Sequence, residues 1–380
     1  MKSGKNKCIG RVAILTPAFF PQVCGVGDYT ANLIKSSKRF ADASIISWSG
    51  RGQYTWGGHT VIGVDGDENT LDHVLSIEEF NVLIVQFASL GFGELGKKTD
   101  RLIESILRWR SREATNKVLV FIHETWVWEL RSILHLLLVR RQKKFVSSIV
   151  RVSDFVLTNN ITNRKHIKTL AGIDVPVIPV PANIEMDPNR CMDQLAKYEK
   201  ARSSGGIAVV VFGMPEKRIK TIKNHRRSLE ILEENGLLGR VEVIGKGLLE
   251  NDRSAQEYRL LRKYIPVEKI KIRGVLPLES VQKVLCKSHV MLTYYNTKEA
   301  GKSGVIKAAM SHGMVVLSSK KIKWPGSMDF RMLKKALKSF KGDEPQLMEY
   351  FFVHGMDGKS YYELECSWER TVRAYNLAGC

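Results

Sequence analysis

The stretch with the clearest chemistry is a run of glycine, lysine and serine, Gly301-Lys302-Ser303-Gly304, near the end of the chain. The apolar run HVMLTYY before it predicts a buried strand, and the residues from Val305 to Met310 predict a helix. A helix N-terminus presents unpaired backbone N–H groups and about half a positive charge. Glycines there let a ligand approach the backbone closely, so the expected ligand is a phosphate or a diphosphate.

A nucleotide-binding P-loop is one interpretation of this stretch, because Gly-Lys-Ser ends the Walker pattern. That pattern needs a glycine where this chain has Asn296. The 80 residues from Gly301 to Cys380 are also too few for the sheet that a P-loop domain builds after its first helix. The sequence therefore disfavours a P-loop.

The same segment resembles the donor loop of retaining GT-B glycosyltransferases of the group 1 or family 4 kind. In that family an acidic, glycine-bearing loop precedes a helix that ends Ala-x-x-x-Gly, and a short hydrophobic strand follows. Here the closing residues run from Ala309 to Gly313 and are followed by MVVLSS. The resemblance implies that Glu299 and the residues from Gly301 to Gly304 hold the diphosphate of a nucleotide sugar.

One position departs from the family pattern of two glutamates separated by seven residues, the second of which binds the ribose. Counting from Glu299 reaches Lys307, and alignment on Gly313 puts Ala308 at the second position. The subgroup that the chain most resembles often has a basic-Ser-Gly start, which Lys302 and the next two residues match. The departure leaves the ribose without its usual carboxylate.

A second set of cations follows the predicted strand that ends before Gly213. This segment resembles the first strand and loop of the donor domain, where an arginine or lysine and a second lysine grip the diphosphate. Cations beside a pyrophosphate leaving group stabilise the charge that develops as its bond breaks. Lys223 best matches the family's Lys-Gly at a helix start, with Asn224 replacing the glycine. A solvated basic loop is the alternative. The candidate cations are Lys217 and Lys223, assigned to catalysis, and Arg218 and Lys220, assigned with Gly213 to donor binding.

In the first half of the chain, the motif FIHETW places His123 and Glu124 at the end of an apolar strand. A neutral imidazole at the carboxyl end of a strand can orient a hydroxyl group or accept a proton near neutral pH. In the GT-B family a histidine at this point reaches the transferred sugar, so the resemblance implies a catalytic His123. A structural histidine is the alternative interpretation.

Two further loops of the first half resemble ligand-binding loops of the family. The motif PQVCGVGDYTANL carries Gly25, Gly27 and Asp28 at a predicted helix start, and the resemblance implies a place near the donor phosphates and the acceptor. A plain helix-start turn is the alternative. The motif VQFASLGFGELG follows another strand and is expected to line the acceptor side. The acceptor-side residues are then Asp28, Gln86 and Glu124.

These residues need elements to position them, and strands alternate with helices along the whole chain, which favours parallel, doubly wound sheets. The predicted strands are 11–16, 44–48, 60–64, 82–87, 118–123, 155–159, 207–212, 241–244 and 270–274. The predicted helices are 99–112, 163–171, 224–234, 255–264, 278–287 and 361–377. The fold class is therefore α/β, a GT-B fold with two Rossmann-like domains facing across a cleft. Ligands of such sheets bind outside the carboxyl ends of the strands.

The domain boundaries follow from composition and from the resemblance. An acceptor domain is expected over residues 1–183, with 1–9 disordered. The connection is expected over 184–205, where the proline-rich stretch 175–188 gives way to a polar run. A donor domain is expected over 206–360. The last segment, 361–380, resembles the helix that returns to the first domain in GT-B proteins.

The formal net charge of +20 indicates either an anionic partner or a basic surface exposed to solvent. No nucleic-acid-binding motif is present, so no nucleic acid is expected. The segment from Ile133 to Val152 combines apolar residues with RRQKK and suits an anionic membrane surface, or equally a core helix with one solvated basic face. No run of 18 apolar residues occurs, so no membrane-spanning helix is expected.

Cysteines and acidic residues give no metal pattern. The six cysteines are scattered without a CxxC pair or metal-ligand spacing, which favours a reducing compartment and argues against a zinc site. Asp65-Gly66-Asp67 has the form of a metal-binding DxD motif, but it lies in a turn-like stretch, and GT-B enzymes generally need no metal. We interpret it as a turn. The expected co-substrate is the nucleotide sugar, with no metal and no other cofactor.

Together these features predict a cytoplasmic glycosyltransferase, with peripheral attachment to the inner face of the membrane left open. It would move a sugar from a nucleoside diphosphate sugar to a hydroxyl of a glycan or a lipid-linked acceptor, with retention, in polysaccharide or glycoconjugate synthesis. A non-catalytic GT-B-like scaffold that binds a partner or polyanion is an alternative from another class. A basic nucleic-acid-binding protein is the third, and it predicts salt-sensitive oligonucleotide binding.

Overall fold

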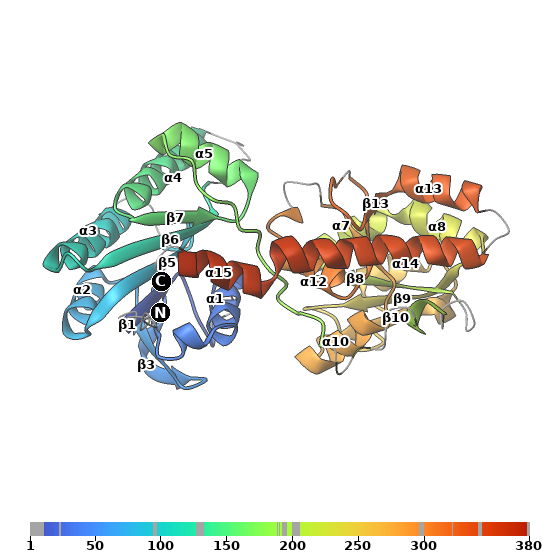
Figure 1. Ribbon diagram of the computed structural model, residues 1–380. Coiled ribbons are helices and arrows are strands. Elements are labelled where there is room, and N and C mark those ends of the chain that lie inside the picture. Colours follow the sequence, from blue (N-terminus) through green and yellow to red (C-terminus); the bar gives the residue numbers. More distant parts are fainter. Residues whose placement is uncertain are drawn as a thin grey trace, which may run out of the picture. The chain divides into compact units, whose positions relative to one another are not determined.

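The structure is a computed structural model that describes residues 11–22, 24–93, 97–126, 133–187, 189, 191, 196–199, 206–295, 300–320, 322–340 and 344–377. The chain divides into two compact units. Unit 1 comprises Met1–Pro179 and Trp368–Cys380, and unit 2 comprises Val180–Ser367. Each unit has a largely parallel sheet with helices on both faces (Figure 1). The predicted α/β class with two Rossmann-like domains is confirmed.

The sheet of unit 1 has the strand order β3-β4-β2-β1-β5-β6-β7. Among the strands that the structure describes in this unit, only the edge pair β3–β4 is antiparallel. The strands are β1 (Arg11–Thr16), β2 (Ser44–Ser47), β3 (Arg51–Trp56), β4 (His59–Val64), β5 (Phe80–Ala88), β6 (Lys117–Glu124) and β7 (Phe155–Thr158). The helices are α1 (Gly25–Lys35), α2 (Glu68–Ile77), α3 (Lys97–Arg112), α4 (Ile133–Arg151), α5 (Ile161–Ala171) and α15 (Trp368–Leu377).

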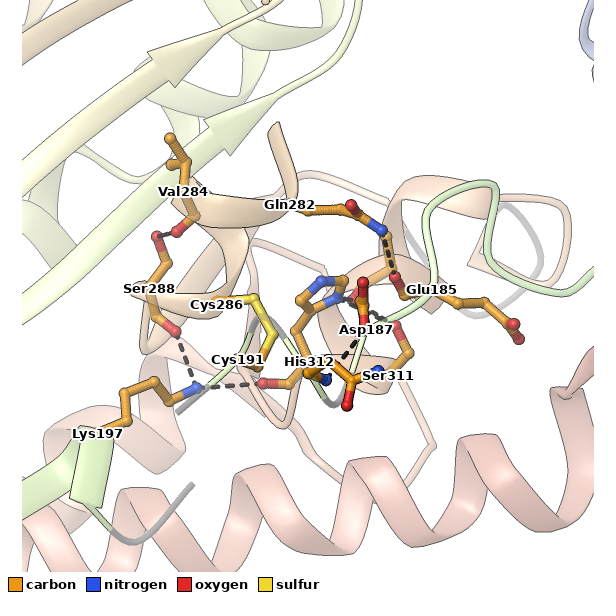
Figure 2. Close-up of a disulfide and its surroundings, with 12 residues drawn as sticks. Glu185, Asp187, Cys191, Lys197, Gln282, Val284, Cys286, Ser288, Ser311 and His312 are labelled. Atoms are coloured by element: carbon orange, nitrogen blue, oxygen red, sulfur yellow. Dashed lines mark hydrogen bonds between the residues drawn. A yellow bond between two sulfur atoms is a disulfide. The ribbon is translucent and has the colours of Figure 1, made fainter. Parts of the chain in front are cut away.

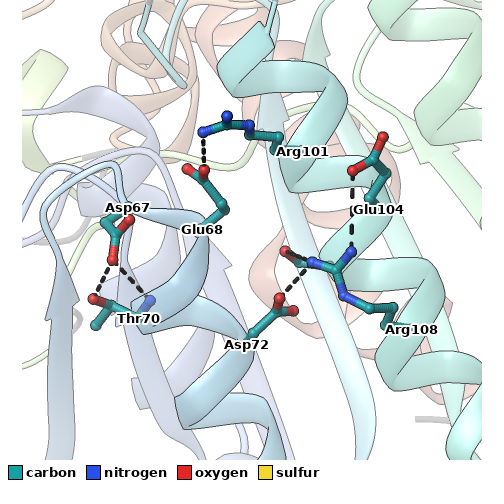
Figure 3. A network of polar contacts seen from close by, with 8 residues as sticks. Asp67, Glu68, Thr70, Asp72, Arg101, Glu104 and Arg108 are labelled. Carbon is teal, nitrogen blue, oxygen red and sulfur yellow. Dashed lines mark hydrogen bonds and ion pairs between the residues drawn. The ribbon is translucent and has the colours of Figure 1, made fainter.

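The central strands of unit 1 are apolar on both faces, because helices cover both sides of a parallel sheet. In β5 and β6 almost every residue is buried. Helices α2 and α3 are joined by ion pairs from Arg101 to Glu68 and from Arg108 to Asp72 (Figure 3). Their rows of charges therefore lie between two helices that cover the same part of the sheet.

The sheet of unit 2 has the order β10-β9-β8-β11-β12-β13, and its neighbouring strands run parallel. The strands are β8 (Ile207–Phe212), β9 (Leu238–Ile244), β10 (Ile270–Gly274), β11 (Val290–Thr293), β12 (Val315–Ser318) and β13 (Ser327–Asp329). The helices are α7 (Pro215–Asn224), α8 (Arg226–Glu234), α9 (Gln256–Leu261), α10 (Leu278–Cys286), α12 (Gly304–Ser311), α13 (Phe330–Ser339) and α14 (Glu344–Tyr361).

The sequence predicted one continuous helix over 361–377, but the C-terminal segment is interrupted. Helix α14 ends at Tyr361, a π-helical turn spans Tyr362–Cys366, and extended backbone at Ser367 precedes α15. The break at Ser367 coincides with the boundary between the units. Within unit 1, Tyr375 of α15 is fully buried and stacks on Phe121 with ring centroids 6.0 Å apart.

Two elements differ from the sequence-based prediction for visible reasons. The antiparallel strand β3 was missed because its residues are mostly exposed, although the turn Gly57-Gly58, with positive φ at both residues, favours a hairpin. The predicted helix 224–234 is α8, and it is preceded by α7, which the sequence analysis treated as a basic loop. Pro215 occupies the first turn of α7, where its missing N–H has no helical partner to lose.

The Asp65-Gly66-Asp67 stretch is a turn, as predicted. Asp65 and Gly66 adopt positive φ, and Asp65 pairs with Arg51. The carboxylate of Asp67 caps α2 by accepting from the amide and the hydroxyl of Thr70 (Figure 3), and these bonds lower the pKa of Asp67. Helix capping thus accounts for Asp67, and the ion pair with Arg51 accounts for Asp65.

One cysteine pair departs from the reduced thiols that a reducing compartment favours. Cys191 and Cys286 form a disulfide across 95 residues, with their Cα atoms 5.2 Å apart. Sequence spacing could not reveal this pair, because the fold of unit 2 alone brings the two residues together.

Candidate functional site

The candidate donor site lies at the carboxyl edge of the sheet of unit 2, where the strand order changes direction. Strand β8 lies between β9 and β11, so the chain proceeds outward from β8 on both sides. Ligands of open α/β sheets bind at such a switch point. The segments after β8 and β11 supply the residues that the sequence analysis selected.

Helix α12 begins at this edge. The hydroxyl of Ser303 caps it by accepting from the amide of Ile306 at 3.3 Å, and Gly304 is its first residue. A Cβ at position 304 would lie 2.6 Å from Oδ1 of Asn183, so glycine lets the Asn183 amide approach the helix start. Lys302 is exposed just before the cap. The predicted helix start at Lys302-Ser303-Gly304 is confirmed; its role in binding a phosphate stays a prediction, and Glu299 lies outside the described residues.

Three lysines gather around the ring of Tyr294, which directly follows β11. The ammonium group of Lys217 donates to the Tyr294 hydroxyl at 2.6 Å and lies 5.2 Å from the ring centroid. The ammonium groups of Lys220 and Lys320 lie 6.0 Å and 5.7 Å from the same centroid. We call these four residues the Tyr294 cluster.

Three like charges around one ring repel each other unless an anion balances them. Among the described residues, no carboxylate forms an ion pair with Lys220 or Lys320. The sequence analysis named Lys217 and Lys220 but missed Tyr294 and Lys320. The available signal was position, since both missed residues follow parallel strands and must reach the same edge of the sheet.

Arg218 makes different contacts from its lysine neighbours. Its side chain is fully buried and pairs with Glu257 at 2.8 Å. The same guanidinium donates to the carbonyl of Gly213 and, at 3.1 Å, to the carbonyl of Lys246. It therefore holds the loops after β8 and β9 together. Gly213, with φ of 132°, occupies a conformation that favours glycine.

Lys223 lies in the last turn of α7 and is exposed, so it does not stand at a helix start as the sequence predicted. It lies six positions after Lys217, which is about 9 Å along the helix axis. Lys217 and Lys220, rather than Lys223, therefore contact the ring of Tyr294. His225, the first residue after α7, donates from Nε2 to the carbonyl of Thr293 at 2.6 Å, and burial lowers its pKa to about 4.

Lys307, one of the two residues that the sequence analysis set against the family's second glutamate, is completely buried. Its ammonium group donates to the carbonyl of Ala300 at 3.3 Å and lies 4.0 Å from the ring centroid of Trp324. Burial lowers its pKa to about 8. Neither Lys307 nor Ala308, the other candidate for that position, offers a carboxylate to a ribose.

In unit 1, His123 is the next-to-last residue of β6 and lies in a buried polar network. Its Nε2 lies 2.9 Å from Oε1 of Gln86, and the Gln86 amide donates to the Tyr375 hydroxyl at 3.1 Å. An acceptor at Nε2 fixes the proton on that nitrogen and leaves the lone pair on Nδ1. The carbonyl of His123 accepts from Asn159 and Asn163. The sequence analysis named His123 and Gln86 separately, and the structure brings them together. Glu124 follows, half-buried.

Helix α1 begins beside the loop after β1. A Cβ at Gly27 would lie 2.5 Å from the carbonyl oxygen of Ala18, so close packing explains this glycine. Gly25 faces open space. Asp28, in the first turn of α1, is half-buried, and burial raises its pKa. A ligand role for the Gly-x-Gly pair stays a prediction, since packing alone accounts for one of its two glycines.

The basic helix α4 is a core helix with one solvated face. Phe145, Val146, Ile149 and Val150 join the core of unit 1, while Arg140, Arg141, Lys143 and Lys144 are exposed. Leu136 and Leu137, one turn before these cations, are also exposed. Among the described helices, none is both long and apolar enough to cross a membrane.

Comparisons with known proteins complete the picture of the fold. No protein-family model matches the chain, and no curated protein matches it in sequence. Solved structures do match over nearly the whole length. Sucrose-phosphate synthase from Thermosynechococcus elongatus has a TM-score of 0.62 at 11% identity, covering 97% of this chain and 98% of that one.

A glycosyltransferase from Rickettsia africae gives a TM-score of 0.62 at 11% identity, covering 97% of each chain. An E. coli structure described as trehalose-6-phosphate bound with UDP-2-fluoro glucose gives 0.61 at 10% identity, covering 97% of this chain and 98% of that one. Identities this low establish the architecture alone. The chain has the GT-B fold.

Proposed function

We propose that the chain is a glycosyltransferase that uses a nucleoside diphosphate sugar. The observation that carries this proposal is the Tyr294 cluster at the strand-switch edge of unit 2, on the same edge as the capped start of α12. Clustered cations and a helix N-terminus together suit the two phosphates of a donor. The GT-B fold, which the neighbouring nucleotide-sugar enzymes share, supports the assignment.

The reaction that we propose breaks the bond between the anomeric carbon and the diphosphate oxygen. Lys217, Lys220 and Lys320 would stabilise the negative charge that collects on the leaving diphosphate. The acceptor hydroxyl would form the new bond and pass its proton to a departing phosphate oxygen, with retention of configuration. For unit 1, the family resemblance assigns contact with the sugar to His123 and with the acceptor to Asp28, Gln86 and Glu124. No metal and no other cofactor is required by this scheme.

The acceptor is proposed from the family resemblance, whereas the donor is argued from the Tyr294 cluster and the start of α12. We propose a hydroxyl of a glycan or a lipid-linked glycan, in polysaccharide or glycoconjugate synthesis, with a family 4-like relationship and a cytoplasmic location. The exposed Leu136 and Leu137 beside four cations of α4 support contact with an anionic membrane surface. Binding of the protein to vesicles with and without anionic lipid tests this proposal, and it should require both the anionic lipid and the exposed residues of α4. Binding that is unchanged without the anionic lipid and without these residues, or no binding to either kind of vesicle, would contradict it.

A donor panel tests the main proposal. Thermal-shift measurements with UDP-, GDP- and ADP-sugars should show one base that stabilises the protein as occupancy rises. Release of the nucleoside diphosphate then measures transfer. Lys217→Ala should reduce that release about 100-fold, as loss of one charge-stabilising donor does. Lys271→Ala, at an exposed position of β10, is the matched control and should keep the wild-type rate.

A non-catalytic GT-B-like scaffold is the second candidate, and the buried Lys307 favours it because the usual ribose-binding carboxylate is missing. A scaffold predicts no nucleotide release with any donor, even where a nucleotide sugar stabilises the fold. Release that depends on Lys217 and on His123, tested with His123→Ala, would exclude it. Equal rates in both variants and the wild type would instead contradict the site assignment.

A further inference from the structure

The disulfide of unit 2 lies beside a buried histidine that the proposed function does not use (Figure 2). Cys191 belongs to the segment that precedes β8, Cys286 ends α10, and His312 follows the last residue of α12. The two sulfur atoms and a ring nitrogen of His312 all lie within 4.8 Å of one another. Three separate parts of unit 2 thus converge on one point.

The imidazole of His312 is held in a single orientation. Its Nδ1 lies 2.7 Å from the carbonyl of Ala308 and 3.1 Å from the hydroxyl of Ser311. A carbonyl can only accept, so Nδ1 carries the proton and Nε2 carries the lone pair. This is the arrangement by which proteins orient a metal-binding histidine, with the other ring nitrogen bonded to a backbone carbonyl.

The lone pair of Nε2 has no partner among the described residues, and His312 is completely buried. A buried polar atom of this kind calls for an explanation, because leaving it unsatisfied is costly. A disulfide offers it no hydrogen. A metal ion or a thiol hydrogen would satisfy it, and either requires reduced cysteines.

The ligand types select the metal class. Two thiolates and one imidazole form a nitrogen–sulfur set, which suits Zn²⁺ and related borderline-soft divalent ions. Around tetrahedral zinc, two sulfur ligands lie about 3.8 Å apart and a sulfur and a nitrogen about 3.5 Å. Reduction lets the sulfurs separate to such distances while the Cα atoms stay near 5.2 Å. Cys191 is half-buried, so water can complete the coordination.

We propose that Cys191, Cys286 and His312 form a zinc-type site in the reduced protein, and that oxidation to the disulfide releases the metal. The oxidant class is a small-molecule disulfide. Its sulfur–sulfur bond is reduced to two thiolates, the two cysteine thiolates are oxidised to the Cys191–Cys286 bond, and Zn²⁺ leaves. The metal joins the end of α12 to α10 and to the segment before β8, whereas the disulfide joins only the last two.

The sequence analysis argued against zinc because the cysteines lack ligand spacing. That argument holds for short motifs, in which neighbouring residues supply two ligands. Here the intervals are 95 residues between the cysteines and 26 from Cys286 to His312, so the fold has to assemble the site.

The test uses the full chain, reduced with a phosphine and freed of metal, or oxidised with glutathione disulfide. Zn²⁺ and Co²⁺ are the probes. The reduced chain should bind one equivalent of Zn²⁺, measured by elemental analysis after gel filtration. With Co²⁺ it should show thiolate-to-cobalt charge-transfer absorption in the near ultraviolet. The oxidised chain should lose both signals, a comparison that needs no variant.

The variants assign the ligands. Cys191→Ser and Cys286→Ser should each reduce the charge-transfer band by half or more. His312→Gln should weaken Zn²⁺ binding by more than about 10–100-fold, which is the effect of losing a residue that only contacts a metal ligand. Cys24→Ser removes a thiol from unit 1 and should change nothing. Circular dichroism confirms that each variant is folded. Reduced wild-type protein that binds no more Zn²⁺ than Cys286→Ser would overturn the proposal and leave a thiol–imidazole hydrogen bond.

Discussion

Arg218 and Lys307 carry positive charge into the interior of unit 2, and their surroundings give them roles that differ from those of the exposed lysines. Arg218 meets a carboxylate and two carbonyl groups there, whereas Lys307 meets one carbonyl and an aromatic ring. A buried charge with a full set of partners is stable only while each partner remains. Lys220 and Lys320, by contrast, keep their charge available at the surface.

Removal of one member of the Arg218–Glu257 pair is expected to destabilise unit 2 strongly. Glu257→Gln leaves the guanidinium buried without its counter-charge, which costs about 3–5 kcal/mol of unfolding free energy. The double variant Arg218→Met with Glu257→Leu should cost less than Glu257→Gln alone. Urea denaturation measures both. An unfolding free energy for Glu257→Gln within 1 kcal/mol of wild type, on the order of a surface change, would contradict this reading.

Lys307 gives unit 2 a pH-dependent stability. Its folded pKa of about 8 lies below the ordinary 10.5, so between these values the unfolded chain binds more protons. The unfolding free energy should therefore rise with pH across this window, and below pH 8 the full penalty is present.

The measurement compares wild type with Lys307→Met from pH 8 to 10.5, the window set by that shift. Met cannot titrate, so the difference in unfolding free energy between variant and wild type should change by on the order of 3 kcal/mol across the window. Lys271→Met, at an exposed position, should follow the wild-type slope. A parallel pair of curves for Lys307→Met and wild type would show that the buried amine keeps its ordinary pKa.

At the scale of secondary-structure elements, helix α1 packs closely against the loop after β1, and Gly27 makes this close packing possible. Gly27→Ala would place a methyl group 2.5 Å from the backbone oxygen of Ala18, which cannot move as a side chain can. Overpacking of this kind costs about 1–3 kcal/mol. Gly25→Ala, two residues earlier in the same helix with open space around it, should be neutral or slightly stabilising. Thermal unfolding of the two variants should separate them by several degrees, and equal midpoints would contradict the packing argument.

The periodicity of apolar residues predicted the elements in which buried positions are apolar and exposed positions are polar. It failed for elements without such a clear division. The central strands β1, β5, β6 and β8 were expected from their apolar runs. Strand β3 exposes most of its residues, and α7 carries four cations, so neither gives a clear pattern.

The same limit applies to the candidate site. The start of α12 was predicted from residue type and position along the chain, whereas Lys217 and Lys220 were named through the family resemblance, among four candidate cations. The burial of Arg218 depends on Glu257, 39 residues away, and the Cys191–Cys286 pair on a fold that spans 95 residues. Contacts of this range follow from the tertiary structure, which local sequence patterns do not encode.

At the scale of the whole molecule, the two units differ in how the chain builds them. Unit 2 is one continuous segment, 180–367, with its own apolar cores on the two sides of its sheet. Unit 1 uses residues up to 179 and then the last segment, from which Trp368, Thr371 and Tyr375 are buried. Trp368 packs on Tyr29 at 5.1 Å between ring centroids.

This difference predicts different behaviour of the separated parts. A chain of residues 180–367 should unfold cooperatively and keep the donor-induced thermal shift, because the Tyr294 cluster and α12 belong to it. A chain of residues 1–179 should lose cooperativity, since each large buried apolar side chain missing with α15 removes about 1.5–3 kcal/mol. Addition of the segment 368–380 through a flexible linker should restore it, because Tyr375 then returns to Gln86 and Phe121. Cooperative unfolding of 1–179 alone, at the midpoint of the linked form, would mean that α15 contributes nothing to unit 1.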